Sequence, residues 1–429
     1  MRSQTETSGL VMHCTAAVVA VIGVLTAPPV LGQVTSDQAA AILIYPHIAF
    51  SAADAVDTTV QLTNTSDRPV NVRCFYQRAA RDCHYTAFTV SLTAQQPIAW
   101  RASAGLPTLP LNDVPTNGQF NTGLVPPVSD DPYDGSLVCI AVDDSDEHIP
   151  VALNVLIGQA TVERRRTSST PLFDSSAYRA IGIGARPEGN NGDAALLLGG
   201  SSAEYDACPL ALTPMHFFDG AIDPISTTNS ISTSLVLISC SQNLTDLAPR
   251  DVTIEFDVSN EFEQRLQTTG VLHGCEPIGP LSQIDADIPE RSIFHVGVMG
   301  TLTGYSRITA KDDQVGLLGL MIETHRNVAD PALTHTTLFT PQWQGVRTQR
   351  DALVLPDLAP PECLGDCNND LTVTIDELLT GVGIAMGASS ADACPQHGRI
   401  RPPFDANYDG QVTIDEILKA VNNALEGCL

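Results

Sequence analysis

Apolar and polar residues alternate with a period of two over much of the chain before residue 356. The clearest case is residues 59–63, where Val60 and Leu62 alternate with threonine and glutamine. Such alternation places one set of side chains in a core and the other in water, which is typical of half-buried β-strands. The first series of these segments comprises residues 59–63, 70–76, 88–92 and 136–142.

A second series of strand patterns follows a basic triplet, Arg164 to Arg166, and a stretch rich in serine and threonine. Its segments are residues 234–238, 252–258, 295–298 and 317–322. Their spacing predicts a second antiparallel β domain. We therefore predict a mainly β protein with two antiparallel β-sandwich-like domains, at 33–166 and 172–355, then a proline-rich linker at 356–362 and a small α-helical domain at 363–429.

The N-terminus has the three-part pattern of a secretory signal. Arg2 precedes an apolar stretch from about residue 10 to 25, and Gly32 is a small residue suited to cleavage. A membrane anchor is the alternative, but the apolar stretch is short for a span of ~30 Å and two prolines follow it. We predict a signal peptide at 1–32, no membrane span after its removal, and a secreted or cell-surface protein.

The cysteines suit an oxidising compartment. The sequence has eleven, and removing Cys14 with the signal leaves ten, an even number that predicts disulfides. Three lie between residues 74 and 139 and three between 208 and 275, so either one bridge joins these two groups or each group keeps a free thiol. Buried unpaired cysteines are the alternative for all of them, and zinc is the alternative for the last four.

The charge balance limits the partners. The chain has 49 acidic and 22 basic residues and a formal net charge of -27. Nucleic acids and anionic membrane surfaces would be repelled, so we exclude both as partners.

The C-terminal region contains a repeat. Residues 366–387 and 405–426 match at 11 of 22 positions when they are aligned at an offset of 39. Each copy opens with twelve residues that carry oxygen ligands at positions 1, 3, 5, 7 and 12, the spacing of an EF-hand calcium loop. The predicted ligands to two Ca²⁺ ions are Asp366, Asn368, Asp370, Thr372 and Glu377, and Asp405, Asn407, Asp409, Gln411 and Glu416.

The two loops differ at position 6, where the turn needs a positive φ. Loop 405–416 has Gly410 there, whereas loop 366–377 has Leu371, which costs ~1–2 kcal/mol in that conformation. We therefore expect loop 405–416 to bind calcium more strongly. The alternative is that these Asp- and Asn-rich turns only cap the helices that follow them.

Two family resemblances rest on these patterns. Duplicated loops with an exit helix and no entering helix resemble dockerin modules of secreted polysaccharide-degrading systems, which implies calcium binding and a cohesin-like or other surface partner. The sequence departs from dockerins by glutamate at position 12 and by four cysteines around the loops. Residues Asp57 to Tyr76 resemble the immunoglobulin-like β-sandwiches of bacterial surface proteins, which implies no activity.

No catalytic motif is found in the sequence, which lacks GxSxG, HExxH and GxxxxGK[ST]. Glu255, Glu261 and Glu263 are the candidates for a glycosidase-like carboxylate pair, but Glu255 alternates with apolar residues and is expected to face solvent. We expect a secreted or cell-surface calcium-binding protein with non-catalytic structural or adhesive β domains. The alternative is a dockerin-bearing, carbohydrate-binding or glycoside-hydrolysing component of a polysaccharide-degrading system.

Overall fold

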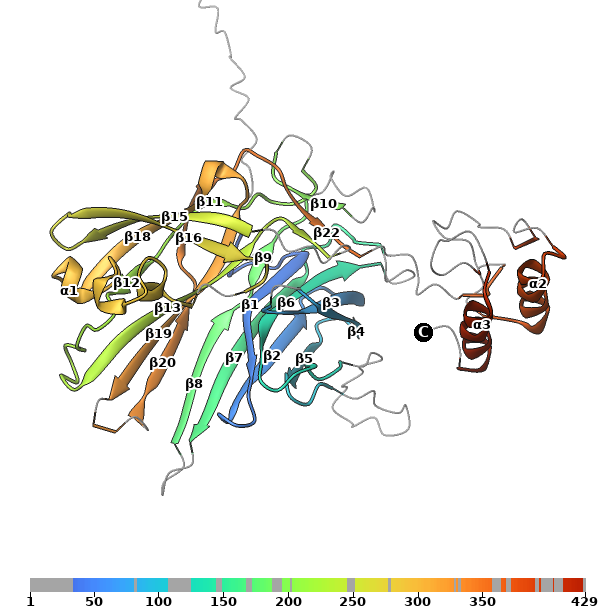
Figure 1. Cartoon of the computed structure of the whole chain (residues 1–429), viewed down its shortest axis with the longest axis horizontal. Coiled ribbons are helices and arrows are strands. Elements are labelled where there is room, and N and C mark those ends of the chain that lie inside the picture. The colour runs from blue at the N-terminus through green and yellow to red at the C-terminus, as the bar shows by residue number, and fades with distance from the viewer. Residues whose placement is uncertain are drawn as a thin grey trace, which may run out of the picture. The chain divides into compact units, whose positions relative to one another are not determined.

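The computed structural model describes most of the chain from residue 34 onward. The described ranges are 34–80, 83–106, 125–143, 149–166, 172–186, 195–200, 203–244, 251–276, 279–327, 329–330, 333–356, 364–367, 372–389, 393–394, 404 and 412–426. The predicted signal peptide at 1–32 and nearly all of the predicted linker lie outside them. Within these ranges strands dominate, as the alternation predicted, and they form five sheets (Figure 1).

Two sheets come mostly from the first half of the chain. The first has the order β4-β3-β6-β1-β9, with β1 at Ile42–Phe50, β3 at Val70–Arg78, β4 at Tyr85–Leu92, β6 at Tyr133–Val142 and β9 at Ile181–Ile183. The second has the order β5-β2-β7-β8, with β2 at Val56–Asn64, β5 at Pro97–Arg101, β7 at Leu156–Arg166 and β8 at Leu172–Arg179. All pairings in both sheets are antiparallel.

Three further sheets come from the second half. One has the order β16-β15-β18-β11-β21, with β11 at Pro209–Thr213, β15 at Asp251–Asn260, β16 at Arg265–His273, β18 at Thr303–Ala310 and β21 at Gln342–Val346, and β12 at Met215–Phe217 pairs with β18. Another has the order β17-β13-β19-β20, with β13 at Asn229–Ser239, β17 at Gly279–Pro280, β19 at Leu317–Asn327 and β20 at His335–Phe339. The smallest has the order β10-β22-β14, with β10 at Ala195–Leu198, β14 at Gln242–Asn243 and β22 at Asp351–Val354.

The predicted fold class is wrong in its arrangement. Instead of two β-sandwiches and a helical EF-hand domain, the strands form five sheets. Their number equals the number of blades in a five-blade β-propeller arrangement. These sheets are not the consecutive blades of a regular propeller, because β1 lies between β6 and β9 and β11 lies between β18 and β21. Alternation predicts where strands occur, but it carries no information about which strands pair, and this is the reason for the error.

The immunoglobulin-like, EF-hand and dockerin resemblances are likewise not supported. The described part of the C-terminal region contains two short helices, α2 at Ile375–Ala385 and α3 at Ile414–Glu426, and no helix–loop–helix pair. The resemblances rested on ligand spacing and alternation, which are local properties and do not require the parent fold. Calcium binding must therefore be argued from the residues themselves.

One predicted strand is a helix. Residues 295–298 were expected to be extended, but Val296–Met299 forms α1, which is one turn long. His295 accepts a hydrogen bond from the Gly297 N–H at the start of this turn, and Gly300 ends it with a φ of 70°. A short apolar run fits a strand and a helical turn equally well, so these caps decide between them.

The two halves of the β body share their cores. Val236, Leu320 and Leu338 from the second half belong to the buried cluster built mainly by β1 to β7. The Cys83–Cys275 disulfide joins the halves covalently, so of the two alternatives left open for the odd cysteine groups, the structure has the bridge between them. The other disulfides in the described residues are Cys74–Cys139, Cys208–Cys240 and Cys367–Cys394.

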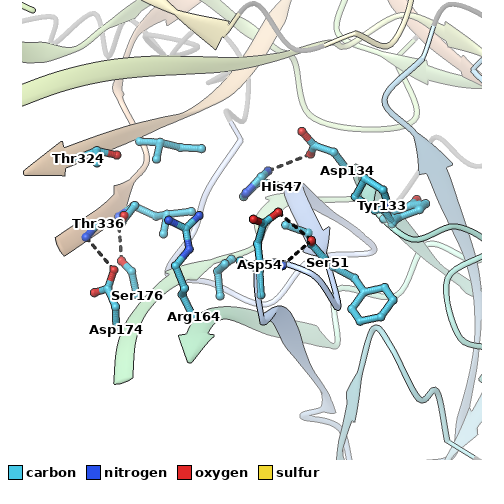
Figure 2. Close-up of a pocket in the computed structure, with 17 residues that line it drawn as sticks. His47, Ser51, Asp54, Tyr133, Asp134, Arg164, Asp174, Ser176, Thr324 and Thr336 are labelled. Atoms are coloured by element: carbon cyan, nitrogen blue, oxygen red, sulfur yellow. Dashed lines mark hydrogen bonds and ion pairs between the residues drawn. The ribbon is translucent and has the colours of Figure 1, made fainter. Parts of the chain in front are cut away.

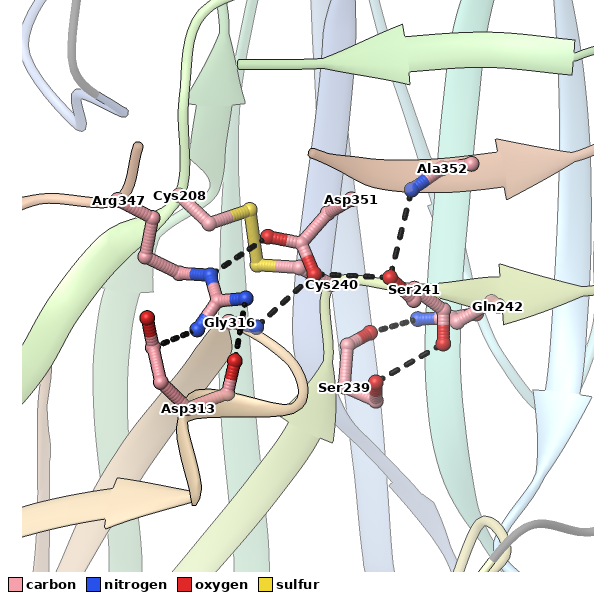
Figure 3. The surroundings of a disulfide bond; sticks show 10 residues. All are labelled: Cys208, Ser239, Cys240, Ser241, Gln242, Asp313, Gly316, Arg347, Asp351 and Ala352. Carbon is pink, nitrogen blue, oxygen red and sulfur yellow. Dashed lines mark hydrogen bonds and ion pairs between the residues drawn. A yellow bond between two sulfur atoms is a disulfide. The ribbon is translucent and has the colours of Figure 1, made fainter. Parts of the chain in front are cut away.

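A buried ion pair lies beside one of these disulfides. Arg347 and Asp351 are each 1% exposed, and Arg347 Nε donates to Asp351 Oδ2 at 2.9 Å. The other Asp351 oxygen accepts from Ser241 Oγ at 2.8 Å and from the Gly316 N–H at 3.0 Å. The Arg347 guanidinium also reaches the carboxylate of Asp313 (Figure 3). This network ties β22 to the segments that follow β13 and precede β19.

Candidate functional site

A cavity of about 310 Å³ lies where the first two sheets meet β19 and β20 (Figure 2). Its lining combines charged, hydroxyl-bearing and apolar side chains from both halves of the β body. The polar members are His47, Ser51, Asp54, Tyr133, Asp134, Arg164, Asp174, Ser176, Thr324 and Thr336. The apolar members include Phe50, Val162, Ile322 and Leu338.

A β-bulge brings His47 to this cavity. The register of β1 against β6 shifts between Tyr45 and Ile48, and a bulge of this kind changes the direction of the side chains within it. The hydroxyl of Tyr178 fixes the backbone of His47, since it accepts from the His47 N–H at 3.1 Å and donates to its carbonyl at 2.5 Å. Burial raises the pKa of Tyr178 well above its ordinary value, so this hydroxyl keeps the proton that it donates.

His47 also contacts a carboxylate. Its Nδ1 lies 3.2 Å from Asp134 Oδ1, without a hydrogen bond between the two atoms. Asp134 is the second residue of β6 and its side chain is 50% exposed. The pair therefore places a ring nitrogen and an accessible carboxylate at one wall of the cavity.

The opposite wall is held by side chains of β8. Asp174 Oδ2 accepts from the Thr336 N–H at 3.0 Å, and Ser176 Oγ accepts from the Leu338 N–H at 2.8 Å. The other Asp174 oxygen contacts His335 Nδ1 at 2.7 Å. These contacts join the edges of two sheets, so Asp174 and Ser176 serve mainly to position β20.

Two charged side chains between these walls have capacity left for a ligand. Arg164 is exposed on β7, and no ion pair to its guanidinium is found among the described residues. Asp54 accepts from Ser51 Oγ at 2.8 Å through only one of its oxygens. Figure 2 shows Arg164, Asp54 and His47 projecting into the same space. The arrangement offers donors and acceptors of both charges beside an apolar wall, which is chemistry suited to binding.

Elsewhere in the β body, a buried histidine and a buried serine contact each other as a general base and a nucleophile do in an active site. His216 Nε2 lies 2.7 Å from Ser306 Oγ, and Nδ1 lies 3.1 Å from the Phe217 carbonyl. However, His216 is 3% exposed and Ser306 is 1% exposed. Burial lowers the pKa of His216 to about 4, so the ring is neutral and its contacts serve packing.

The predicted calcium ligands are only partly described. Asn368, Asp370, Asp405, Asn407, Asp409 and Gln411 lie outside the described residues. Of the others, Asp366, Glu377 and Glu416 are buried, with exposed fractions of 1%, 8% and 3%, and Thr372 is exposed. No group of three or more His, Cys, Asp or Glu suited to a metal is found within the described part of the chain.

The glutamates at loop position 12 cap their helices. Glu377 Oε2 accepts from the Thr374 N–H at 2.8 Å, and Glu416 Oε2 accepts from the Thr413 N–H at 2.8 Å. In the first loop Glu377 Oε1 also accepts from the Cys367 N–H at 2.9 Å, which brings the end of the loop back to its start. Each loop thus ends in a threonine and a glutamate whose side chains contact each other at the start of a helix, whereas the alternative assigned the capping to Asp and Asn residues.

Sequence reasoning missed a duplicated apolar stripe on the two helices. Leu379 of α2 and Met386, the residue that caps the C-terminus of α2, are exposed, and so are Leu418 and Leu425 of α3. Together with the first residue of each helix, these residues form two stripes. The first stripe comprises Ile375, Leu379 and Met386, with exposed fractions of 75%, 64% and 74%. The second stripe comprises Ile414, Leu418 and Leu425, with exposed fractions of 77%, 56% and 79%. Corresponding members are 39 residues apart, the offset of the repeat.

No protein-family model matches this sequence, and no curated protein matches it. Its four described disulfides are typical of an extracellular or secreted protein. None of the helices in the described ranges has the length and apolar character needed to cross a membrane.

Proposed function

We propose that this chain is an extracellular calcium-binding protein whose C-terminal region binds two Ca²⁺ ions and whose β body has a structural or adhesive role. The observation that carries the proposal is the burial of Asp366, Glu377 and Glu416 in a region with little apolar core. Only Cys394, Phe404 and Ala420 form the buried cluster described there.

The negative charge of this region favours the binding of a cation. Residues 363–429 contain ten acidic and three basic residues, which gives 3 − 10 = −7. Backbone N–H groups and the hydroxyls of Thr374 and Thr413 donate to the buried carboxylates of Glu377 and Glu416. A hard divalent cation held by six to eight oxygens would further stabilise negative charge in this region, since carboxylates are costly to bury without a compensating charge. The ligands we propose are the ten loop residues predicted from the sequence.

We further propose that the exposed stripes of α2 and α3 bind another surface protein. Other residues of these helices, namely Leu378, Ile384 and Ile417, pack on the cluster around Phe404. The stripes are thus not used for that packing, and their recurrence at the offset of 39 indicates a shared role. Exposed apolar residues that gather on one face are characteristic of interaction surfaces.

Thermal unfolding of the full chain, followed through its helical circular dichroism, tests the calcium proposal. Calcium should raise the melting temperature over that in a chelator, because a ligand at 100 times its Kd stabilises the folded state by about 2.7 kcal/mol. Glu377→Gln with Glu416→Gln should abolish the shift. The matched control, Asp376→Asn with Asp415→Asn, changes the adjacent non-ligand carboxylates and should retain it. Equal melting in calcium and chelator would overturn the proposal.

The docking proposal has its own test. Leu379→Glu with Leu418→Glu should prevent binding of a partner identified in the cell-envelope fraction and then purified for calorimetry. Ala424→Glu, a substitution at an exposed α3 residue that is not three or four residues from any stripe member, is the control. A partner bound equally by all three proteins would show that the stripes are not the docking surface.

A further inference from the structure

The cavity of Figure 2 restricts its ligand by charge. Asp54, Asp134 and Asp174 line it, and the whole chain has a formal net charge of -27, so an anion would be repelled. Arg164 lines the same space, so the lining offers both carboxylate acceptors and a guanidinium donor. A neutral ligand rich in hydroxyl groups can donate to the carboxylates and accept from the guanidinium at the same time.

The cavity also restricts its ligand by shape. Phe50, Val162, Ile322 and Leu338 give it an apolar surface that matches the C–H face of a ring. At about 310 Å³ it lies at the lower end of the range for ligand pockets, which suits one or two sugar rings. Its walls are fixed by the bonds of Tyr178 to His47 and of Ser176 to Leu338, so the site is formed before a ligand enters.

We propose that this cavity binds a neutral saccharide unit. Arg164 donates to ring or hydroxyl oxygens, and the free oxygens of Asp54 and Asp134 accept from sugar hydroxyls. Phe50 and Leu338 contact the apolar face of the ring. Both halves of the β body contribute, since Arg164 lies on β7 and Leu338 lies on β20. The proposal goes beyond calcium binding and does not depend on the C-terminal loops.

The tryptophans do not offer a competing sugar site. Trp100 is 3% exposed, and its Nε1–H donates to the Tyr76 hydroxyl at 2.5 Å. Trp343 is half-buried and packs against two apolar clusters of the β body. Neither presents a free ring face of the kind on which sugars stack.

Binding of the purified full chain to an array of neutral mono- and oligosaccharides, followed by calorimetry on the saccharides that bind, tests the proposal. Arg164→Met and Asp54→Asn should each weaken binding about tenfold or more, since each removes a charged hydrogen-bonding group. Arg179→Met is the matched control, because Arg179 is exposed on β8 and does not line the cavity. It should bind like the unaltered chain.

The proposal would be overturned if no neutral saccharide binds, or if only charged compounds such as amino acids or polyamines bind. It would also be overturned if Arg164→Met binds as tightly as Arg179→Met. Circular dichroism of each variant checks that the fold is retained, which is expected because Arg164 and Asp54 are both exposed.

Discussion

Arg347 and Asp351 form the most deeply buried ion pair found among the described residues, each with 1% of its side chain exposed. Removing one partner of such a pair leaves an uncompensated charge in the interior, which typically costs about 3–5 kcal/mol. Arg347→Met should therefore lower the free energy of unfolding by that amount in urea titrations. Arg347→Met with Asp351→Leu should recover part of the loss. A double variant less stable than the single one would contradict this account.

His216 makes the stability of the β body depend on pH. Burial lowers its pKa from 6.5 to about 4, so the unfolded chain takes up a proton at a higher pH than the folded chain does. The stability linked to His216 is complete above about pH 6.5 and is lost as the pH falls toward 4, by about 3 kcal/mol in total. The free energy of unfolding, measured between pH 7 and 4, should show this loss.

His216→Gln should remove this part of the pH dependence, whereas His84→Gln, at an exposed histidine, should leave it unchanged. If the slope between pH 7 and 4 is the same in both variants, another group is responsible. At the residue scale the sequence could not indicate this role, because lone histidines are scattered through it and burial depends on tertiary packing.

At the scale of elements, the sequence predicted where strands occur better than it predicted which strands pair. The alternation of β15 was read correctly, with Val252, Ile254, Phe256 and Val258 buried and Glu255 exposed. The pairing of β1 with β6 and β9 joins segments far apart in the chain, and no local pattern encodes it. The same limit applies to the cavity, since His47 reaches it through a bulge and Leu338 comes from a distant strand.

The helices of the C-terminal region show a similar limit. The sequence predicted a helix after each loop but not which face of that helix is buried. Leu378 packs on the cluster around Phe404, whereas its neighbour Leu379 is 64% exposed. The number of apolar residues on each helix exceeds what so small a core can cover, so the surplus is exposed.

The two loops proposed to bind calcium should differ in their affinity for it. Leu371 occupies the position where loop 405–416 has Gly410, and the difference of ~1–2 kcal/mol corresponds to about 5–30-fold in affinity. Calorimetry of Asp405→Ala, which leaves loop 366–377, should give the weaker site, and Asp366→Ala should give the stronger one. Leu371→Gly in the Asp405→Ala chain should restore much of the difference. A tighter site in loop 366–377 would refute this explanation.

For the whole molecule, we expect the Cys83–Cys275 bridge and the shared cores to make the β body unfold as one unit. The bridge spans 192 residues, and removing a disulfide that closes a long loop typically costs about 2–5 kcal/mol. Cys83→Ser with Cys275→Ser should lower the urea midpoint while the unfolding remains a single transition. Two separate transitions in that variant would show that the halves are independent domains.

The central claim, calcium binding by the C-terminal region, is tested most directly by the number of ions bound. Calorimetric titration of the chelator-treated full chain with CaCl₂ should give two Ca²⁺ per chain, and one in either Asp366→Ala or Asp405→Ala. A chain that takes up no calcium, or that binds the same number of ions after both substitutions are combined, would contradict the account.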